Sequence, residues 1–408
     1  MIVLSGADLV LPDRILTSGT LTIDDGRITE ISAEPQGAGS PFAFHGHTIV
    51  PGFIDVHVHG VEGVDTLDEG NAIRRIAQLL PRYGVTAFCP TTVACAPEDL
   101  RRVLEQVRDA REAPGTGTAR VLPAHLESNF LNPEYRGAQP LSCLRKPAAL
   151  AAAELASEPD EFAAADILSV IETCSPDVAV VTLAPELEGG LALISRLIAL
   201  GIRVSLGHSG ATCDEGAAAI AAGAHRATHL FNQMPPMHHR SPGLAGAVLQ
   251  SDDVAAEVIC DGVHVHPALI RVVVNAKGPS RVMAISDGTA AAGLAPGQTA
   301  RLGGRTIVAS ERCAFLEDGT MAGSVMTMDK VFRNLTVAMG FSPLDAVMMC
   351  STTPARELSL VGHGVLAEGA VADFVVLDSA GQVVQTYVAG RLAHARGSAG
   401  NSAPTASV

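Results

Sequence analysis

The sequence predicts an α/β fold: a (β/α)8 TIM barrel with a small β-sandwich domain formed from both termini. In the middle of the chain, short apolar segments alternate with Ala- and Leu-rich helical segments, which is the pattern of parallel strands joined by helices. Both ends instead carry short strand-like segments separated by turn signals. With 408 residues, 47% of them hydrophobic, the chain can bury a large core.

The barrel prediction depends on eight apolar segments of strand length. They are Ile49–His57, Val85–Thr91, Arg120–Glu127, Val178–Ala184, Arg203–His208, Arg226–Leu230, Ala255–Cys260 and Val282–Asp287. Helical segments separate most of them: Asn71–Arg82, Pro97–Glu112, Glu188–Leu200, Cys213–Ala222 and Pro267–Asn275. Eight such units over about 300 residues are typical of a TIM barrel. An open doubly wound sheet is the alternative, and it is weakened because no strand precedes a glycine-rich phosphate fingerprint.

The domain boundaries follow from the same patterns. Residues 1–50 and 362–397 are expected to form the small β domain, with Asp25-Gly26 as a hairpin turn. Residues 51–361 are expected to form the barrel. Within them, residues 289–325 break the alternation and predict a β-hairpin insertion that acts as a lid or pocket wall. The low-complexity tail, residues 398–408, is expected to be disordered.

Composition narrows the functional class. The formal net charge is −15 and no run of Lys or Arg occurs, which argues against nucleic-acid binding. No apolar run reaches the length of a membrane span, and the N-terminus lacks a signal-peptide pattern. The eight Cys residues are scattered without a CxxC pair. We therefore expect a cytoplasmic protein with free thiols.

Metal-binding residue types end five of the eight predicted strands. They are His57 and His59 at the first strand, Glu127 at the third, His208 at the fifth, His229 at the sixth and Asp287 at the eighth. Residues two apart in a strand share a face, so both histidines of the first pair can approach one ion. The functional groups of a TIM barrel lie at the C-terminal ends of its strands. The joint pattern predicts a site for Zn²⁺ or Fe²⁺, with Mn²⁺ or Co²⁺ as further possibilities.

Each of these residues taken alone is weak support, because a single histidine is usually structural or solvated. The convergence of five strand ends makes the prediction much stronger. The histidines outside this pattern are expected to be structural or solvated: His45, His47, His225, His238, His239, His363 and His394.

A series of motifs makes the chain recognisable. In order they are PGFIDVHVHG, GVTAFCPTT, HLES followed by LNPEYRGA, SLGHSGAT, ATHLFNQM, RSPGLAGA, DGVHVHP, SDGTAAAG, DGTMAGS and STTPAREL. The sequence resembles the N-acetylglucosamine-6-phosphate deacetylase family of the amidohydrolase superfamily over nearly its whole length. An HxH motif by itself indicates only the superfamily, whereas LGHSGAT followed by ATHLFNQM, RSPGLAG and DGVH is close to family-specific.

The resemblance implies individual roles. Glu127, His208 and His229 would hold the metal ion that the family always keeps. His57 and His59 would hold a second ion, as in binuclear members, with Glu127 bridging the two. Asp287 would be a further ligand and the catalytic acid and base, taking a proton from the attacking water and delivering it to the leaving amine. We expect one or two divalent ions, with zinc favoured.

Substrate contacts follow from the same resemblance. Arg240 would meet the 6-phosphate, because its guanidinium presents a fork of donors that suits phosphate oxygens. In this family that arginine typically comes from the neighbouring subunit, which implies a homodimer. The remaining predicted substrate residues are Ala138, Gln139, Asn232, Gln233, His264, Met321, Ala322 and Gly323.

Two positions depart from the family pattern. Ser128 and Asn129 replace the usual Gly-Pro after the glutamate, and Gln139 replaces a histidine expected to help polarise the acetyl carbonyl. Glutamine can donate a hydrogen bond there but cannot shuttle a proton. The predicted activity is deacetylation of N-acetylglucosamine 6-phosphate. The alternatives are N-acetylgalactosamine 6-phosphate or another N-acyl compound, then a cyclic amide, then a non-catalytic scaffold.

Overall fold

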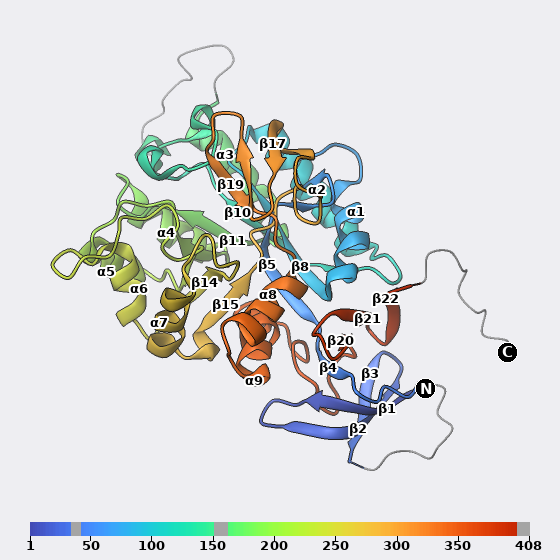
Figure 1. Ribbon diagram of the computed structural model, residues 1–408. Helices are drawn as coiled ribbons and strands as arrows, with labels where there is room; N and C mark the ends of the chain where they lie inside the picture. Colours follow the sequence, from blue (N-terminus) through green and yellow to red (C-terminus); the bar gives the residue numbers. More distant parts are fainter. Residues whose placement is uncertain (34–41, 151–161, 398–408) are drawn as a thin grey trace.

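A barrel of eight parallel strands forms the body of the protein (Figure 1). The computed structural model describes residues 1–33, 42–150 and 162–397, so the tail predicted to be disordered lies outside the described residues. The strands follow chain order: β5 (Phe53–Val58), β8 (Val85–Thr92), β10 (Ala124–Glu127), β11 (Val178–Leu183), β12 (Arg203–Leu206), β13 (Arg226–Ala227), β14 (Ala255–Ile259) and β15 (Val282–Ile285). After β15, Asp287 N–H donates to the His57 carbonyl at 3.0 Å. This contact brings the last strand back to the first, and the predicted barrel is confirmed.

Helices cover the outside of the barrel. They are α1 (Ala72–Leu79), α2 (Pro97–Glu112), α3 (Ala164–Thr173), α4 (Gly190–Ala199), α5 (Cys213–Ala221), α6 (Gly243–Gln250), α7 (Pro267–Lys277), α8 (Met328–Arg333), α9 (Pro343–Val347) and α10 (Thr353–Glu357). In α2 the buried residues Leu100, Val103, Leu104 and Val107 recur at helical spacing, so one stripe packs on the barrel. Among the described residues, no helix has both the length and the apolar character needed to cross a membrane.

Several predicted strands divide or end early. The segment predicted as one strand, Ile49–His57, is two strands, because Gly52 separates β4 (Thr48–Pro51) from β5. A Cβ at Gly52 would meet the Thr86 side chain at 2.2 Å, so only glycine fits where the chain passes from one sheet to the other. The third predicted strand is likewise divided into β9 (Arg120–Val121) and β10.

Both termini contribute to one seven-stranded sheet beside the barrel (Figure 1). Its order is β22 (Arg391–Ala395), β21 (Val383–Val388), β20 (Phe374–Leu377), β4, β1 (Ile2–Val10), β2 (Ile15–Asp24) and β3 (Arg27–Ser32). The predicted small β domain is thus present, built as one continuous sheet that curls around its own core. Its far edge returns toward β20, where Ile28 N–H donates to the Ala370 carbonyl at 2.9 Å. Asp25 and Gly26, both at positive φ, form the predicted turn between β2 and β3.

The segment predicted as a β-hairpin insertion is a four-stranded antiparallel sheet. Its strands are β16 (Thr299–Leu302), β17 (Arg305–Ala309), β18 (Cys313–Leu316) and β19 (Met321–Ser324). The hairpin prediction was too small because the segment contains three reversals, at residues 303–304, 310–312 and 317–320. Ser324 N–H donates to the Asp287 carbonyl at 2.9 Å, which joins the last strand of this sheet to the mouth of the barrel. A short hairpin of β6 (Gly60–Val61) and β7 (Val64–Asp65) follows β5.

Candidate active site

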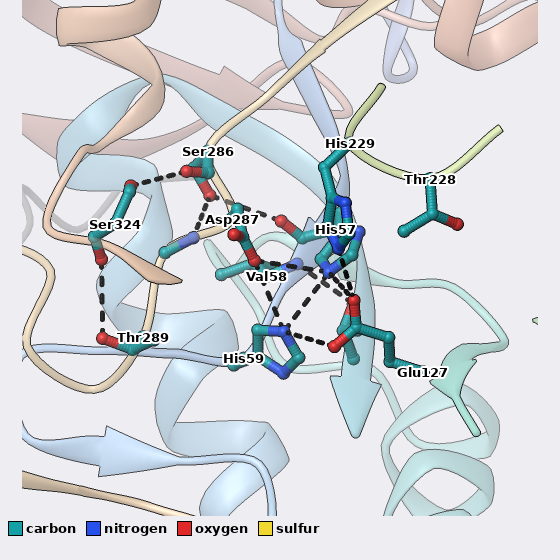
Figure 2. A network of polar contacts seen from close by, with 12 residues as sticks. His57, Val58, His59, Glu127, Thr228, His229, Ser286, Asp287, Thr289 and Ser324 are labelled. Carbon is teal, nitrogen blue, oxygen red and sulfur yellow. Dashed lines mark hydrogen bonds and ion pairs between the residues drawn. The ribbon is translucent and has the colours of Figure 1, made fainter. Parts of the chain in front are cut away.

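Side chains from the C-terminal ends of the barrel strands meet in one pocket. The predicted residues that line it are His59, Glu127, Ala138, Gln139, His208, Asn232, His229, Gln233, His264, Asp287, Met321 and Gly323. His57 lies directly beneath, fully buried on β5 (Figure 2). Residues far apart in the sequence therefore share one mouth of the fold, as the barrel requires.

The loops after three strands hold their functional side chains in an unusual backbone conformation. His208, His229 and Asp287 each lie two residues beyond the end of their strand and have φ values of 49°, 26° and 46°. Non-glycine residues rarely adopt this left-handed region, which costs of order 1–3 kcal/mol per residue. At Asp287, backbone hydrogen bonds stabilise this conformation: its N–H donates to the His57 carbonyl, and its carbonyl accepts from Ser324 N–H.

Glu127 joins two histidines at the centre of the pocket. Its Oε1 lies 3.0 Å from His208 Nε2 and 2.8 Å from His229 Nε2. The two Nε2 atoms are 3.2 Å apart. The Tyr135 carbonyl accepts from His208 Nδ1 at 2.7 Å, which fixes the ring with Nε2 directed at Glu127. The predicted triad of Glu127, His208 and His229 is thus assembled.

A second triad, formed by His57, His59 and Asp287, lies beside Glu127 and His229 of the first (Figure 2). His57 Nε2 and His59 Nε2 are 3.2 Å apart, and Asp287 Oδ1 lies 3.3 Å and 3.4 Å from them. Glu127 reaches this group as well, with Oε1 3.6 Å from His57 Nε2 and Oε2 3.6 Å from His59 Nε2. Glu127 therefore lies between both triads, in the position that a bridging carboxylate would need.

Carboxylates make the pocket strongly attractive to positive charge. Burial by itself would lower the pKa of His57, but its hydrogen bond to Glu257 and the charges of Asp287 and Glu127 raise that pKa to about 10. Burial would raise the pKa of Glu127, yet contact with His208 and His229 holds it well below its usual value. Burial would likewise raise the pKa of Asp287, yet its bond to His59 and the charge of His57 keep it low. Both carboxyl groups are ionised at neutral pH.

The donor set suits a divalent transition metal. Within each triad the candidate ligand atoms all lie within 4.8 Å of one another. Imidazole nitrogens whose lone pairs converge at 3.2 Å repel unless a proton or a cation lies between them. Mixed imidazole and carboxylate ligands are those that zinc and the neighbouring first-row metals bind. The residues present therefore fit one ion at each triad.

The predicted substrate residues differ in how the structure places them. Gln139 donates through Nε2 to Glu127 and accepts from Ala94 N–H at 2.8 Å, so its amide lies beside the metal-ligand candidates. Asp261 Oδ2 lies 2.6 Å from His264 Nδ1 and orients that ring in the pocket. Met321 and Gly323 line the pocket from β19, whereas Ala322 is fully buried in the core of the insertion sheet, because alternate residues of a strand face opposite sides.

Arg240 does not line the pocket of its own chain. It is exposed, and its backbone N–H donates to His238 Nδ1 at 3.3 Å. The loop that carries it also exposes His238, His239 and Met237.

Some residues of the site were not predicted. Val93, Ile259, Thr289 and Leu302 also line the pocket, and no chemical signal in the sequence marks such residues. Glu257 contacts His57 from below, and one signal could have found it: a glutamate stands in the middle of an otherwise apolar predicted strand.

Comparison with known proteins agrees with this geometry. The profile of the amidohydrolase family matches residues 48–393. The N-acetylglucosamine-6-phosphate deacetylase of Rattus norvegicus is 37% identical over 402 residues, with 93% of each chain covered. The chain belongs to the N-acetylglucosamine-6-phosphate deacetylase family of amidohydrolases.

A solved structure and a second relative are also similar to this chain. The structure of a mutant N-acetyl-D-glucosamine-6-phosphate deacetylase from Mycobacterium smegmatis, in complex with N-acetyl-D-glucosamine-6-phosphate, is 32% identical with a TM-score of 0.85, covering 96% of this chain and 99% of that one. The N-acetylgalactosamine-6-phosphate deacetylase of Escherichia coli O157:H7 is 33% identical over 393 residues, with 96% of this chain and 99% of the relative covered.

The departures from the usual family residues have structural explanations. Ser128 Oγ donates to the Thr182 carbonyl at 2.6 Å and accepts from Phe130 N–H at 3.1 Å. Asn129 Nδ2 donates to the carbonyls of Cys95 and Cys143 at 2.8 Å and 2.7 Å. Neither side chain lines the pocket. These two substitutions change how the loop after β10 is held, whereas Gln139 stands in the pocket itself.

Proposed function

We propose that this protein hydrolyses N-acetylglucosamine 6-phosphate to glucosamine 6-phosphate and acetate. The observation that carries the proposal is the meeting of Glu127, His208, His229 and Asp287 in one pocket at the C-terminal ends of four barrel strands. Membership of the deacetylase family supports the same substrate class.

The proposed metal ligands are the two triads. Glu127, His208 and His229 would hold one ion, and His57, His59 and Asp287 would hold a second, with Glu127 shared between them. Zinc is the metal we propose, because zinc favours sites of histidine and carboxylate ligands. When bound, such an ion supplies Lewis acidity, which polarises a carbonyl and acidifies water.

Asp287 is the proposed general base and then general acid. As a carboxylate it accepts a proton from the water whose oxygen bonds to the acetyl carbon. It then donates that proton to the amide nitrogen as the C–N bond breaks, releasing the free amine and acetate. Its peptide is held on both sides by β5 and β19, so the carboxylate stays in position through both steps.

The remaining pocket residues hold the substrate. Gln139 keeps its side-chain carbonyl on Ala94, so its amide hydrogens are directed toward Glu127 and the pocket, where they can donate to the acetyl carbonyl. His264, oriented by Asp261, is proposed to contact the sugar phosphate. Met321 and Gly323 form the wall beside the sugar ring, and Asn232 and Gln233 approach the phosphate.

The phosphate is proposed to bind Arg240 from the second subunit of a homodimer. An arginine exposed on a loop outside its own pocket is available to a neighbouring chain, and its guanidinium matches phosphate oxygens. We also propose a cytoplasmic location, which agrees with eight cysteines that are all unpaired.

A panel of acetate-release assays tests the function. It compares the 6-phosphates of N-acetylglucosamine, N-acetylgalactosamine and N-acetylmannosamine with the unphosphorylated sugars, on protein loaded with Zn²⁺. We expect the highest kcat/KM for N-acetylglucosamine 6-phosphate. N-Acetylgalactosamine 6-phosphate is the second candidate, because a relative of that name is as similar as several glucosamine enzymes. No acetate from any member of the panel would refute deacetylation and favour a non-catalytic scaffold.

A further inference from the structure

A buried ion pair lies beneath the active site, inside the barrel. Glu257 on β14 and Arg226 on β13 are both fully buried, and Arg226 Nη2 donates to Glu257 Oε1 at 2.9 Å. The other carboxylate oxygen, Oε2, lies 2.9 Å from His57 Nδ1. A continuous chain of contacts therefore runs from Arg226 through Glu257 to the ring that faces the pocket from β5.

This pair is costly where it lies. The interior of a TIM barrel is ordinarily filled with branched apolar side chains, and burying two charges costs several kcal/mol per ion before their attraction is counted. Arg226 Nε and Nη1 find no hydrogen-bond partner among the described residues, so the pair is incompletely compensated. Apolar residues of similar volume would fill this space at least as well, so packing does not account for the pair.

The neighbouring histidine does not need the carboxylate. His125 Nδ1 is 3.1 Å from the Val56 carbonyl and its Nε2 is 2.7 Å from Thr182 Oγ1, while Glu257 Oε1 is 4.0 Å away. Both nitrogens of His125 are thus already partnered, and the free oxygen of Glu257 is directed at His57.

His57 also differs from the other three imidazoles of the pocket. His208 is backed by a backbone carbonyl, and the Nδ1 atoms of His59 and His229 have no partner within the described part of the chain. His57 is the imidazole that a carboxylate backs. A carboxylate at Nδ1 holds the proton there, orients the ring and makes Nε2 a stronger ligand.

We propose that Glu257, anchored by Arg226, is a positioning residue for His57 and strengthens the second metal ion's site. The proposal rests on the proposed function only in requiring that His57 and His59 hold an ion. Glu257 does not contact substrate; it acts by directing His57 Nε2 toward His59, Glu127 and Asp287, which lie 3.2–3.6 Å from it.

Glu257→Gln tests the proposal, because it preserves the shape of the side chain and removes its charge. Metal-free protein is titrated with Zn²⁺ in competition with a chromophoric chelator, which resolves the two dissociation constants. We expect the weaker-bound ion, assigned to His57 and His59, to lose about 10- to 100-fold in affinity, while the ion at Glu127, His208 and His229 is unchanged. The absorption spectrum of the Co²⁺-loaded protein should change for the second ion alone.

Asp177→Asn is the matched control. Asp177 is also a buried carboxylate paired with arginine, through Arg108 Nε at 2.9 Å, but it precedes β11 at the opposite end of the barrel. The Asp177→Asn substitution should lower the melting temperature of the metal-free protein without changing the affinity of either zinc site. If Glu257→Gln does not fold, Glu257→Asp keeps the charge but withdraws the carboxylate from His57, and the same selective loss is expected.

The outcomes separate the two proposals. Two ions bound with wild-type affinity in a folded Glu257 variant overturn the positioning role and leave the deacetylase proposal intact. A wild-type protein that binds one ion also overturns it, because no second site then exists to strengthen. Wild-type protein that binds no Zn²⁺ refutes the proposed function itself.

Discussion

Asp287→Asn is the substitution that most directly tests the proposed chemistry. Asparagine has the shape of aspartate, so it creates no cavity and can still accept through its side-chain oxygen where Asp287 Oδ1 faces His57 and His59. The backbone bonds from Ser324 and to His57 do not involve the side chain and are retained. The variant therefore loses the charge and the ability to take up a proton, and little else.

The size of the effect follows from that single loss. A positioned general acid or base contributes about 10²- to 10⁴-fold to a rate, which corresponds to about 3–5 kcal/mol of activation free energy. Asp287 is proposed to serve twice, as base and then as acid, so we expect kcat to fall toward the upper end of this range. KM should change little, because the substrate residues Gln139 and His264 are untouched.

Acetate release under saturating N-acetylglucosamine 6-phosphate measures kcat, and elemental analysis of the same samples measures bound metal. The ion at Glu127, His208 and His229 should remain at wild-type stoichiometry, which distinguishes lost chemistry from lost metal. Asp177→Asn, which removes a buried carboxylate remote from the pocket, should retain wild-type kcat. A kcat for Asp287→Asn within tenfold of wild type, with metal in place, would show that another group moves the proton.

Three further predictions follow from the site. Arg240→Ala should raise KM for phosphorylated substrates about 10- to 100-fold, the cost of a charge-assisted hydrogen bond, and leave unphosphorylated sugars unaffected; an unchanged KM contradicts the phosphate contact. Mixing Asp287→Asn with Arg240→Ala protein should restore activity if each pocket borrows Arg240 from its partner, and no gain after subunit exchange argues against a shared site. Burial lowers the pKa of His125 from 6.5 to about 3, so the folded state binds fewer protons than the unfolded state. The contribution of His125 to the free energy of unfolding is therefore present above pH 6.5 and is lost as the pH falls toward 3. Between pH 7 and pH 5, the metal-free wild-type protein should lose about 2 kcal/mol more unfolding free energy than His125→Gln. Urea denaturation at the two pH values measures this difference. Equal losses in the two proteins would contradict this account.

Tertiary packing explains the elements that the sequence did not predict. Helix α6 contains two glycines, which disfavour an isolated helix, yet a Cβ at Gly216 of α5 would lie 2.8 Å from Ala247 of α6. Close contact between the two helices therefore stabilises α6, and no local pattern shows it. The curled terminal sheet is a similar case, because the contact between Ile28 and Ala370 joins segments from opposite ends of the chain.

The sequence by itself determined the barrel and the residue types at its mouth. Apolar runs mark the strands, and the C-terminal ends of the strands lie at one mouth of a closed barrel. The sequence therefore suffices to predict that four side chains lie close together: Glu127, His208, His229 and Asp287. Only the tertiary structure decided that Glu257 and Arg226 lie beneath His57. It also decided that Ala322 faces a core and that Arg240 lies outside its own pocket. The physical reason is that periodicity records how far a residue lies along its strand, whereas side-chain partners across the barrel are set by closure and packing.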